Sequence, residues 1–185
     1  MTTIQSTIGL LVLDPARPAD LDDVLEILAE AAAWLAAQGI DQWASPPPPG
    51  LRARIAAEIE RGEVYIARPL QDGCAVGTLR FEWRDTELWP DAAGDSAGYV
   101  HSMAIRPTLR GRQLGEALIE WAKMHVRNRQ RHYLRLDCVA TNIALRRYYE
   151  RLRFRYCGEA THGDFTGALY EFDVTESRTP GTENL

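Results

Sequence analysis

The strongest constraint on the fold is residues 99–122, YVHSMAIRPTLRGRQLGEALIEWA, in which three kinds of pattern follow one another. Residues 99–105 are short, apolar-rich and bounded by Pro107, which predicts a strand. Residues 106–113 are a polar segment with three arginines and one glycine. Apolar residues then recur at the spacing of one helical face: Leu114, Ala117, Leu118, Trp121 and Ala122. The sequence therefore predicts a strand that passes through an arginine-rich turn into a helix.

This turn is a candidate phosphate site. The first N–H groups of a helix have no intrahelical acceptors, and the helix dipole adds partial positive charge at the same end. Both features favour a bound anion.

Length and composition predict one globular domain over residues 1–174, followed by a disordered polar tail over residues 175–185. No apolar run approaches the roughly 18 residues that span a bilayer, and no basic segment precedes an apolar one at the N-terminus. The three cysteines, Cys74, Cys138 and Cys157, lack metal or redox spacing. We expect reduced thiols, a cytoplasmic protein, no metal and no membrane partner.

The net charge of −5 is unevenly distributed along the chain. Residues 1–105 carry 7 basic and 16 acidic groups, whereas residues 106–155 carry 13 basic and 4 acidic groups. A basic middle segment suits an anionic ligand and an acidic first half suits a cationic one, although solvated surface charge is an equally good explanation. Nucleic acid is not an expected partner, because the chain is acidic overall and has no recognised binding motif.

Periodicity predicts an α+β fold, a mixed sheet with helices on its faces. Residues 41–50 cannot be regular, because four successive prolines remove donors and fix φ. The closing strands could pair between subunits, so a homodimer is an open alternative. The expected strands are residues 8–13, 63–68, 74–83, 99–105, 133–139, 154–159 and 168–174, and the expected helices begin near residues 21, 51, 114 and 142.

Two segments resemble signatures of the GNAT superfamily of N-acetyltransferases. Residues 110–115, RGRQLG, resemble the Q/R-x-x-G-x-G/A signature for the coenzyme A pyrophosphate, with Gln113 where the family has glycine. Residues 142–154, NIALRRYYERLRF, resemble the N-x-x-A-x-x-x-Y-E-x-L-G-F segment, with Arg153 in place of glycine. The resemblance covers about residues 8–174 and implies a mostly antiparallel central sheet of six to seven strands flanked by about four helices.

The resemblance also implies acetyl-CoA as co-substrate. A strand edge would hold the pantetheine arm, and backbone N–H groups of the turn would hold the pyrophosphate. Gln113 needs only its N–H for this if its φ is negative, whereas a positive φ would strain it. The implied cofactor-binding residues are Met103, Ala104, Ile105, Arg110, Gly111, Arg112, Gln113, Leu114, Gly115, Asn142 and Tyr149.

Acetyl transfer to an amine requires one proton acceptor and one proton donor. Deprotonating a lysine-like amine at neutral pH costs about 4 kcal/mol. His101 is the candidate base. Glu82 or Asp137, acting through water, are alternative bases. His101 could equally be a strand histidine that only packs against its neighbours. Tyr149 matches the family tyrosine that protonates the departing thiolate, while Tyr148 points about 100° away around the helix. Cys138 lies mid-strand without a nearby histidine, which argues against an acyl-cysteine route.

The acceptor site is expected where the first two helices connect. Trp34, Gln42 and Trp43 are candidate substrate-binding residues there, with packing of an irregular loop as the alternative role for the tryptophans. The predicted function is transfer of an acetyl group from acetyl-CoA to a small-molecule primary amine, by direct attack in a ternary complex. The alternatives are a peptide or protein N-acetyltransferase, another acyl-CoA transferase, or a non-catalytic coenzyme A sensor.

Overall fold

The computed structural model describes residues 2–71, 73–90 and 96–176. The expected tail over residues 175–185 therefore lies, from residue 177 onward, outside the described residues. The strands are β1 (Thr2–Ser6), β2 (Gly9–Pro15), β3 (Val64–Pro69), β4 (Gly77–Glu82), β5 (Ala97–Ile105), β6 (Tyr133–Val139), β7 (Arg155–His162) and β8 (Phe165–Asp173). The helices are α1 (Leu21–Ala37), α2 (Leu51–Glu60), α3 (Leu114–Asn128) and α4 (Ile143–Arg151), with short 3-10 helices η1 (Pro18–Asp20) and η2 (Pro107–Leu109).

The described strands form one sheet in the order β1-β2-β3-β4-β5-β6-β8-β7. Only the β5–β6 pair is parallel, so the predicted α+β class and the mostly antiparallel sheet are confirmed. The sheet has eight strands where six to seven were predicted, because β1 forms a hairpin with β2. Its sequence, TTIQS, is mostly polar and carries one apolar residue, the buried Ile4, so no alternation marks it as a strand.

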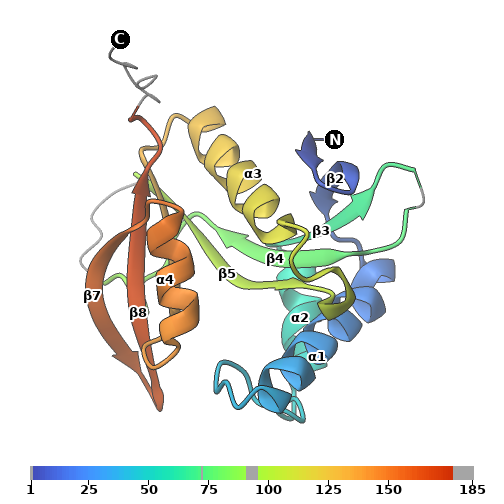
Figure 1. The fold of residues 1–185 in the computed structure, drawn as a ribbon, viewed down its shortest axis with the longest axis horizontal. Helices are drawn as coiled ribbons and strands as arrows, with labels where there is room; N and C mark the ends of the chain where they lie inside the picture. The colour runs from blue at the N-terminus through green and yellow to red at the C-terminus, as the bar shows by residue number, and fades with distance from the viewer. Residues whose placement is uncertain (1, 72, 91–95, 177–185) are drawn as a thin grey trace.

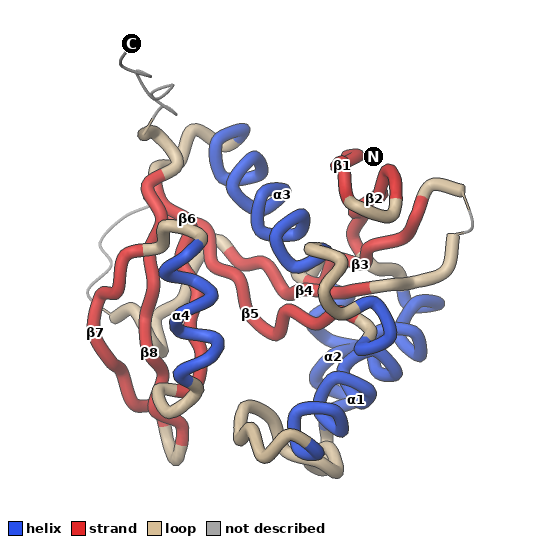
Figure 2. The backbone as a smooth tube through the Cα atoms, in the orientation of Figure 1, coloured by secondary structure: helices blue, strands red, loops and turns tan. Residues whose placement is uncertain are grey.

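Helices cover both faces of the sheet (Figures 1 and 2). One core cluster joins the sheet to α3 and α4, and a second joins it to α1 and α2. Val100 belongs to the first cluster and Ala104 to the second, although residues four apart on a regular strand face the same side. The register of β5 against β4 shifts between Thr78 and Arg80, and Ser102 has a φ of 48° there. This bulge inserts one residue into β5 and moves its later side chains to the opposite face.

The sheet opens between its two central strands. β5 pairs with β6 only from Ala97 to Val100, opposite Tyr133 to Leu136. Beyond that point β5 continues along β4 and β6 continues along β8, so the two strands separate into two arms. Figures 1 and 2 show the β6–β8–β7 arm diverging from the β1–β5 arm. A cavity lined from both arms lies between them, and we call this space the slot. The candidate site lies in this slot.

Candidate active site

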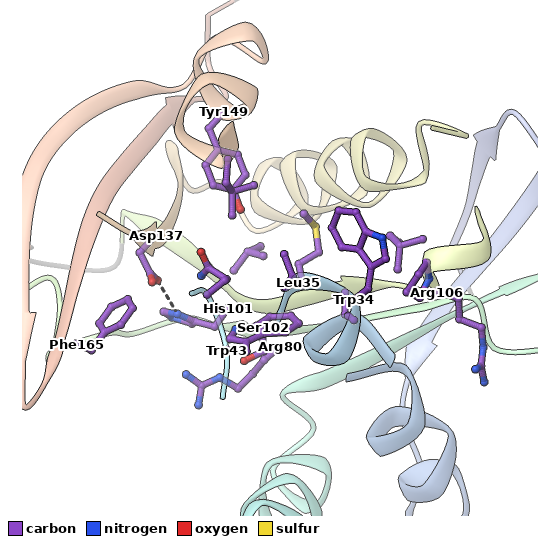
Figure 3. Close-up of a pocket in the computed structure, with 18 of the residues that line it drawn as sticks. Trp34, Leu35, Trp43, Arg80, His101, Ser102, Arg106, Asp137, Tyr149 and Phe165 are labelled. Atoms are coloured by element: carbon purple, nitrogen blue, oxygen red, sulfur yellow. Dashed lines mark hydrogen bonds and ion pairs between the residues drawn. The ribbon is translucent and has the colours of Figure 1, made fainter. Parts of the chain in front are cut away.

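A cavity of about 500 Å³ occupies the slot and is lined from both arms, from α1 and α4, and from the loop between α1 and α2 (Figure 3). Leu136 and Cys138 belong to the core under α3 and α4, so Asp137 between them faces the other side of the sheet. In β5, Val100 likewise belongs to the core under α3 and α4, whereas the next residue, His101, faces the other side of the sheet. Tyr149 of α4 approaches from the first face. The slot therefore brings groups from both faces of the sheet to one cavity.

Met103, Ala104 and Ile105 line the cavity from the part of β5 that lies beyond its last pairing with β6. Their strand pairs with β4 on its other edge, through Ala104 opposite Thr78 and Ile105 opposite Gly77. None of the described strands pairs with the edge toward the slot. Backbone groups on such an edge can pair with an extended amide chain.

The arginine turn leads from η2 into α3 and leaves several donors free. In the described chain the backbone N–H groups of Gly111, Gln113, Leu114 and Gly115 donate to no backbone carbonyl. Those of Arg110 and Arg112 are used within the turn, by the carbonyls of Pro107 and Leu109. Four free N–H groups at the start of a 15-residue helix make an anion cradle.

Gln113 has a φ of 55° and a ψ of 19°, in the left-handed region. The position therefore needs the conformation that glycine adopts freely, and the outcome is the strained one of the two considered from the sequence. A residue with a Cβ pays about 1–2 kcal/mol for this conformation. Its N–H still belongs to the cradle, so the missing glycine alters the energy of the turn and leaves its geometry intact.

Two arginines of the turn carry unneutralised charge. Arg110 and Arg112 form no ion pair with any carboxylate of the described residues, whereas Arg106 is bound to Glu26 and Glu30. The guanidinium carbon of Arg110 lies 4.8 Å from the centre of the Trp34 ring. Trp34 thus lines the cavity at its arginine end, away from His101 and Asp137 (Figure 3).

The hairpin of β1 and β2 supports the same turn. The hydroxyl of Thr7, between the two strands, donates to the backbone carbonyl of Arg112. A strand that the sequence pattern did not reveal therefore helps to fix the loop that presents the free N–H groups.

Tyr149 lies on α4 with 5% of its surface exposed, and that surface lines the cavity. Its hydroxyl makes no hydrogen bond to the described residues, and burial, with the nearby Cys138 and Asp137, raises its pKa well above the usual value. It therefore keeps its proton at neutral pH. Tyr148 points elsewhere, as predicted, since its hydroxyl lies 2.9 Å from where a Cβ on Gly115 would be. Burial raises the pKa of Cys138 to about 12, which leaves this thiol unreactive.

His101 lies on the opposite face among carboxylates. Its Nδ1 is 3.1 Å from Oδ1 of Asp137, and its Nε2 is 3.6 Å from Oδ2 of Asp85 and 3.8 Å from Oε1 of Glu82. The side chains of His101 and Asp137 are 11% and 13% exposed. A carboxylate beside Nδ1 places the proton on that nitrogen and fixes the ring. Nε2 is buried and has no hydrogen-bond partner among the described residues, and both His101 and Asp137 line the cavity.

Asp85 reaches His101 because its own loop is held in a turn. Its Oδ1 accepts from the backbone N–H groups of Glu87 and Leu88, 2.9 and 3.0 Å away, which leaves Oδ2 toward His101. In the sequence, Asp85 is one of four acidic residues within residues 84–97. No local pattern indicates that this one turns inward.

A second charged group adjoins His101. Arg80 donates to Glu58 at 3.0 Å and is 2.8 Å from Glu82, and Glu58 is also paired with Arg54 at 3.2 Å. Desolvation raises the pKa of Glu82. Four carboxylates against two guanidinium groups leave this face of the slot negative, which favours a cationic acceptor. The carboxylates are those of Glu58, Glu82, Asp85 and Asp137.

Gln42 spans the slot from the loop between α1 and α2. Its Oε1 accepts from the side-chain amide of Asn142 at 2.9 Å and from the backbone N–H of Val139 at 3.3 Å. Asn142 also caps α4, since its Oδ1 accepts from the N–H of Leu145 at 3.1 Å. Trp43 lines the cavity and packs against the core of α1 and α2, so its position is compatible with both roles considered for it.

Sequence reasoning missed part of the lining, namely Arg54, Arg80, Leu88, Ser102 and Phe165. Phe165 of β8 lies at the same end of the cavity as Asp137 of β6, the strand that pairs with β8 (Figure 3). Among the described residues, no group of His, Cys, Asp and Glu side chains is arranged to hold a metal ion. No helix within the described ranges is long and apolar enough to cross a membrane.

Comparison with known proteins identifies the class to which this fold and slot belong. The model of the Acetyltransferase (GNAT) family matches residues 26–154, so the chain belongs to the GNAT family. It is therefore an acyltransferase. The uncharacterized N-acetyltransferase YesJ of Bacillus subtilis is 29% identical over 164 residues, 87% of this chain and 89% of YesJ.

Solved structures of other acetyltransferases share the fold. A GNAT-family acetyltransferase from Listeria monocytogenes is 26% identical, with a TM-score of 0.78, over 93% of this chain and 99% of the other. A structure of yncA from Salmonella typhimurium with its cofactor acetyl-CoA has a TM-score of 0.62 at 16% identity, over 93% of this chain and 98% of that one.

Proposed function

We propose that the protein transfers an acetyl group from acetyl-CoA to the primary amine of a small molecule, by direct attack within a ternary complex. One observation carries this proposal. The unpaired hydroxyl of Tyr149 and the His101–Asp137 pair face one cavity from opposite faces of the sheet. A proton donor for a leaving thiolate and a proton acceptor for an attacking amine are needed on opposite sides of a thioester.

The other end of the cavity suits the acyl donor. The open edge of Met103, Ala104 and Ile105 fits the amides of the pantetheine arm, and the four free N–H groups of the arginine turn fit the pyrophosphate. Arg110 and Arg112 add unneutralised positive charge. The side-chain amide of Asn142 now donates to Oε1 of Gln42. The predicted contact of Asn142 with the acyl donor requires this hydrogen bond to break.

The residues divide the chemistry between them. The acceptor ammonium docks at the negative face, and the Asp137–His101 pair accepts its proton. The freed nitrogen attacks the thioester carbon, a C–N bond forms and the C–S bond breaks. Tyr149 donates its proton to the departing sulfur, which leaves as the thiol, and the resulting phenolate recovers a proton from the nitrogen of the new amide. Trp43 and Gln42 hold the acceptor end of the cavity, and Trp34 steadies Arg110 at the other.

Release of free thiol from acetyl-CoA, measured with a pool of small primary amines and then with each alone, tests this function. Thiol release should depend on the amine, and the N-acetylated product should form in equal amount. Without an amine no burst of thiol is expected, because Cys138 does not carry the acetyl group. Binding of acetyl-CoA without turnover across the whole pool would instead identify a coenzyme A sensor.

A further inference from the structure

A second, smaller recess of about 150 Å³ adjoins the main cavity and shares Trp43, Arg54 and Ser102 with it. Its floor is α1, where Leu28 and Ala32 are 8% and 4% exposed. Ser102 follows His101 directly in β5, so the recess begins one residue from the candidate base. It is therefore continuous with the acceptor end of the slot.

The proline run gives this recess an unusual wall. Pro47 and Pro48 line it, and prolines carry no backbone N–H. An apolar group can therefore press against this wall without leaving a backbone donor unpaired, which would otherwise cost several kcal/mol in a dry site. The remaining lining is mainly apolar, from Leu28, Ala32, Trp43, Ala44 and Leu51.

We propose that this recess holds an apolar group of the acceptor, and that the acceptor is a primary amine carrying one aromatic or branched hydrocarbon group. This inference rests on the proposed function and names its substrate class. An apolar cavity of about 150 Å³ holds a benzene-sized group. With its ammonium at Asp137, such an acceptor extends past His101 and Ser102 and buries its hydrocarbon group beneath Trp43.

A second cationic group on the acceptor has no comparable place. The carboxylates that line the small polar cavity beyond His101, of about 190 Å³, are those of Glu82, Asp85 and Glu87. The side chain of Glu87 is 72% exposed, so an ion pair with it would contribute little. The unpaired Oδ2 of Asp85 is itself buried against His101 and does not face that cavity. The carboxylate of Glu82 is paired with Arg80. The geometry thus favours an apolar monoamine over a diamine.

A homologous series of acceptors tests the assignment directly. We would compare benzylamine, 2-phenylethylamine and 3-phenylpropylamine with methylamine and 1,4-diaminobutane, each at saturating acetyl-CoA. Since one methylene in an apolar pocket changes discrimination by about 10–200-fold, the best phenylalkylamine should exceed methylamine and the diamine in kcat/KM by about 100-fold. The number of methylene groups in the best phenylalkylamine reports the distance from Asp137 to the recess.

Variants that fill the recess should remove this preference. Ala32→Leu extends a side chain from the floor, and Leu51→Trp fills the recess from α2 should the first variant fold poorly. Either should lower kcat/KM for the best phenylalkylamine about tenfold while leaving that for methylamine unchanged. Ala36→Leu is the matched control, because Ala36 lies one turn further along α1, is exposed and lines neither cavity.

The outcomes separate this inference from the proposed function. Equal or faster acetylation of methylamine or the diamine, or a phenylalkylamine preference that survives both fillings, would overturn the assignment of the recess and leave amine acetylation standing. Absence of thiol release with every amine would instead overturn the proposed function itself.

Discussion

The two faces of the sheet meet at one slot but surround it very differently. On the α3/α4 face, Tyr149 packs among the rings of Phe154 and Tyr170, and burial keeps its proton in place. On the α1/α2 face, His101 lies within 3.8 Å of three carboxylates. An apolar environment keeps a proton donor neutral, whereas a charged one stabilises an arriving cation. The contrast supports the opposite proton-transfer roles that we propose for the two faces.

The largest expected effect comes from removing the charge on the acceptor face. In Asp137→Asn the amide oxygen can still accept from Nδ1 of His101, so the ring keeps its orientation while the negative charge is lost. We expect kcat/KM for the amine to fall about 100-fold, the lower end of the range for general acid–base groups. Steady-state kinetics over a range of pH would measure this.

Asp164→Asn is the matched control, because Asp164 is exposed in the turn between β7 and β8 and should leave kcat/KM unchanged. A full-rate Asp137→Asn enzyme with an unaltered pH profile would show that the acceptor face contributes packing and not proton transfer.

On the other face, removing one hydroxyl should slow the step in which thiol departs. We expect Tyr149→Phe to lower kcat about tenfold or more, with little change in the affinity for acetyl-CoA, because the hydroxyl acts when charge develops on sulfur. Steady-state thiol-release assays would measure kcat, and calorimetry would measure the affinity for acetyl-CoA. Tyr148→Phe is the control, since its hydroxyl points to Gly115. Equal kcat values for the two variants would remove Tyr149 from the mechanism.

The α3/α4 face was the more predictable of the two from sequence. Its parts lie in two continuous segments, and a helix begins at Leu114 and at Ile143 as the apolar spacing predicted. Backbone N–H groups at a helix start need no particular side chain, so a local pattern suffices to locate them. Seven strands and four helices followed from periodicity in the same way.

The acceptor face could not be assembled from sequence, because its side chains come from elements far apart in the chain. Glu58, Arg80, Asp85 and Asp137 meet only after the sheet has formed. The bulge at Ser102 moves every later side chain of β5 to the other face, and no residue type there indicates it. Strand β1 was missed because its pairing with β2, and not its own apolar pattern, stabilises it.

A smaller effect is expected at the start of α3, where Tyr148 of α4 approaches Gly115. Gly115→Ala would place a Cβ 2.9 Å from the hydroxyl of Tyr148, which must shift, and would crowd the free N–H groups. We expect KM for acetyl-CoA to rise about threefold to tenfold with kcat nearly unchanged, as for a loss of uniform binding. Gly163→Ala, in the exposed turn between β7 and β8, is a control that adds backbone strain, because the φ of Gly163 is 57°, but should leave KM unchanged. A lower kcat with normal KM would mean that Gly115 acts on the chemistry.

The smallest effects concern two residues that replace glycine and share one conformation. Gln113 and Arg153 have φ values of 55° and 67°. Arg153 lies just after α4, where the N–H of Phe154 donates to the carbonyl of Tyr149 at 3.0 Å. Glycine removes about 1–2 kcal/mol of strain but loses about 0.5–1 kcal/mol more backbone entropy on folding. Gln113→Gly and Arg153→Gly should therefore each raise the free energy of unfolding by about 0.5–1 kcal/mol, measured by urea denaturation.

Neither substitution should change the Kd of acetyl-CoA, because the cradle uses the backbone N–H of Gln113 and not its side chain. Markedly weaker acetyl-CoA binding in Gln113→Gly alone would show that the carboxamide contacts the phosphates, so that this face too depends on a side chain.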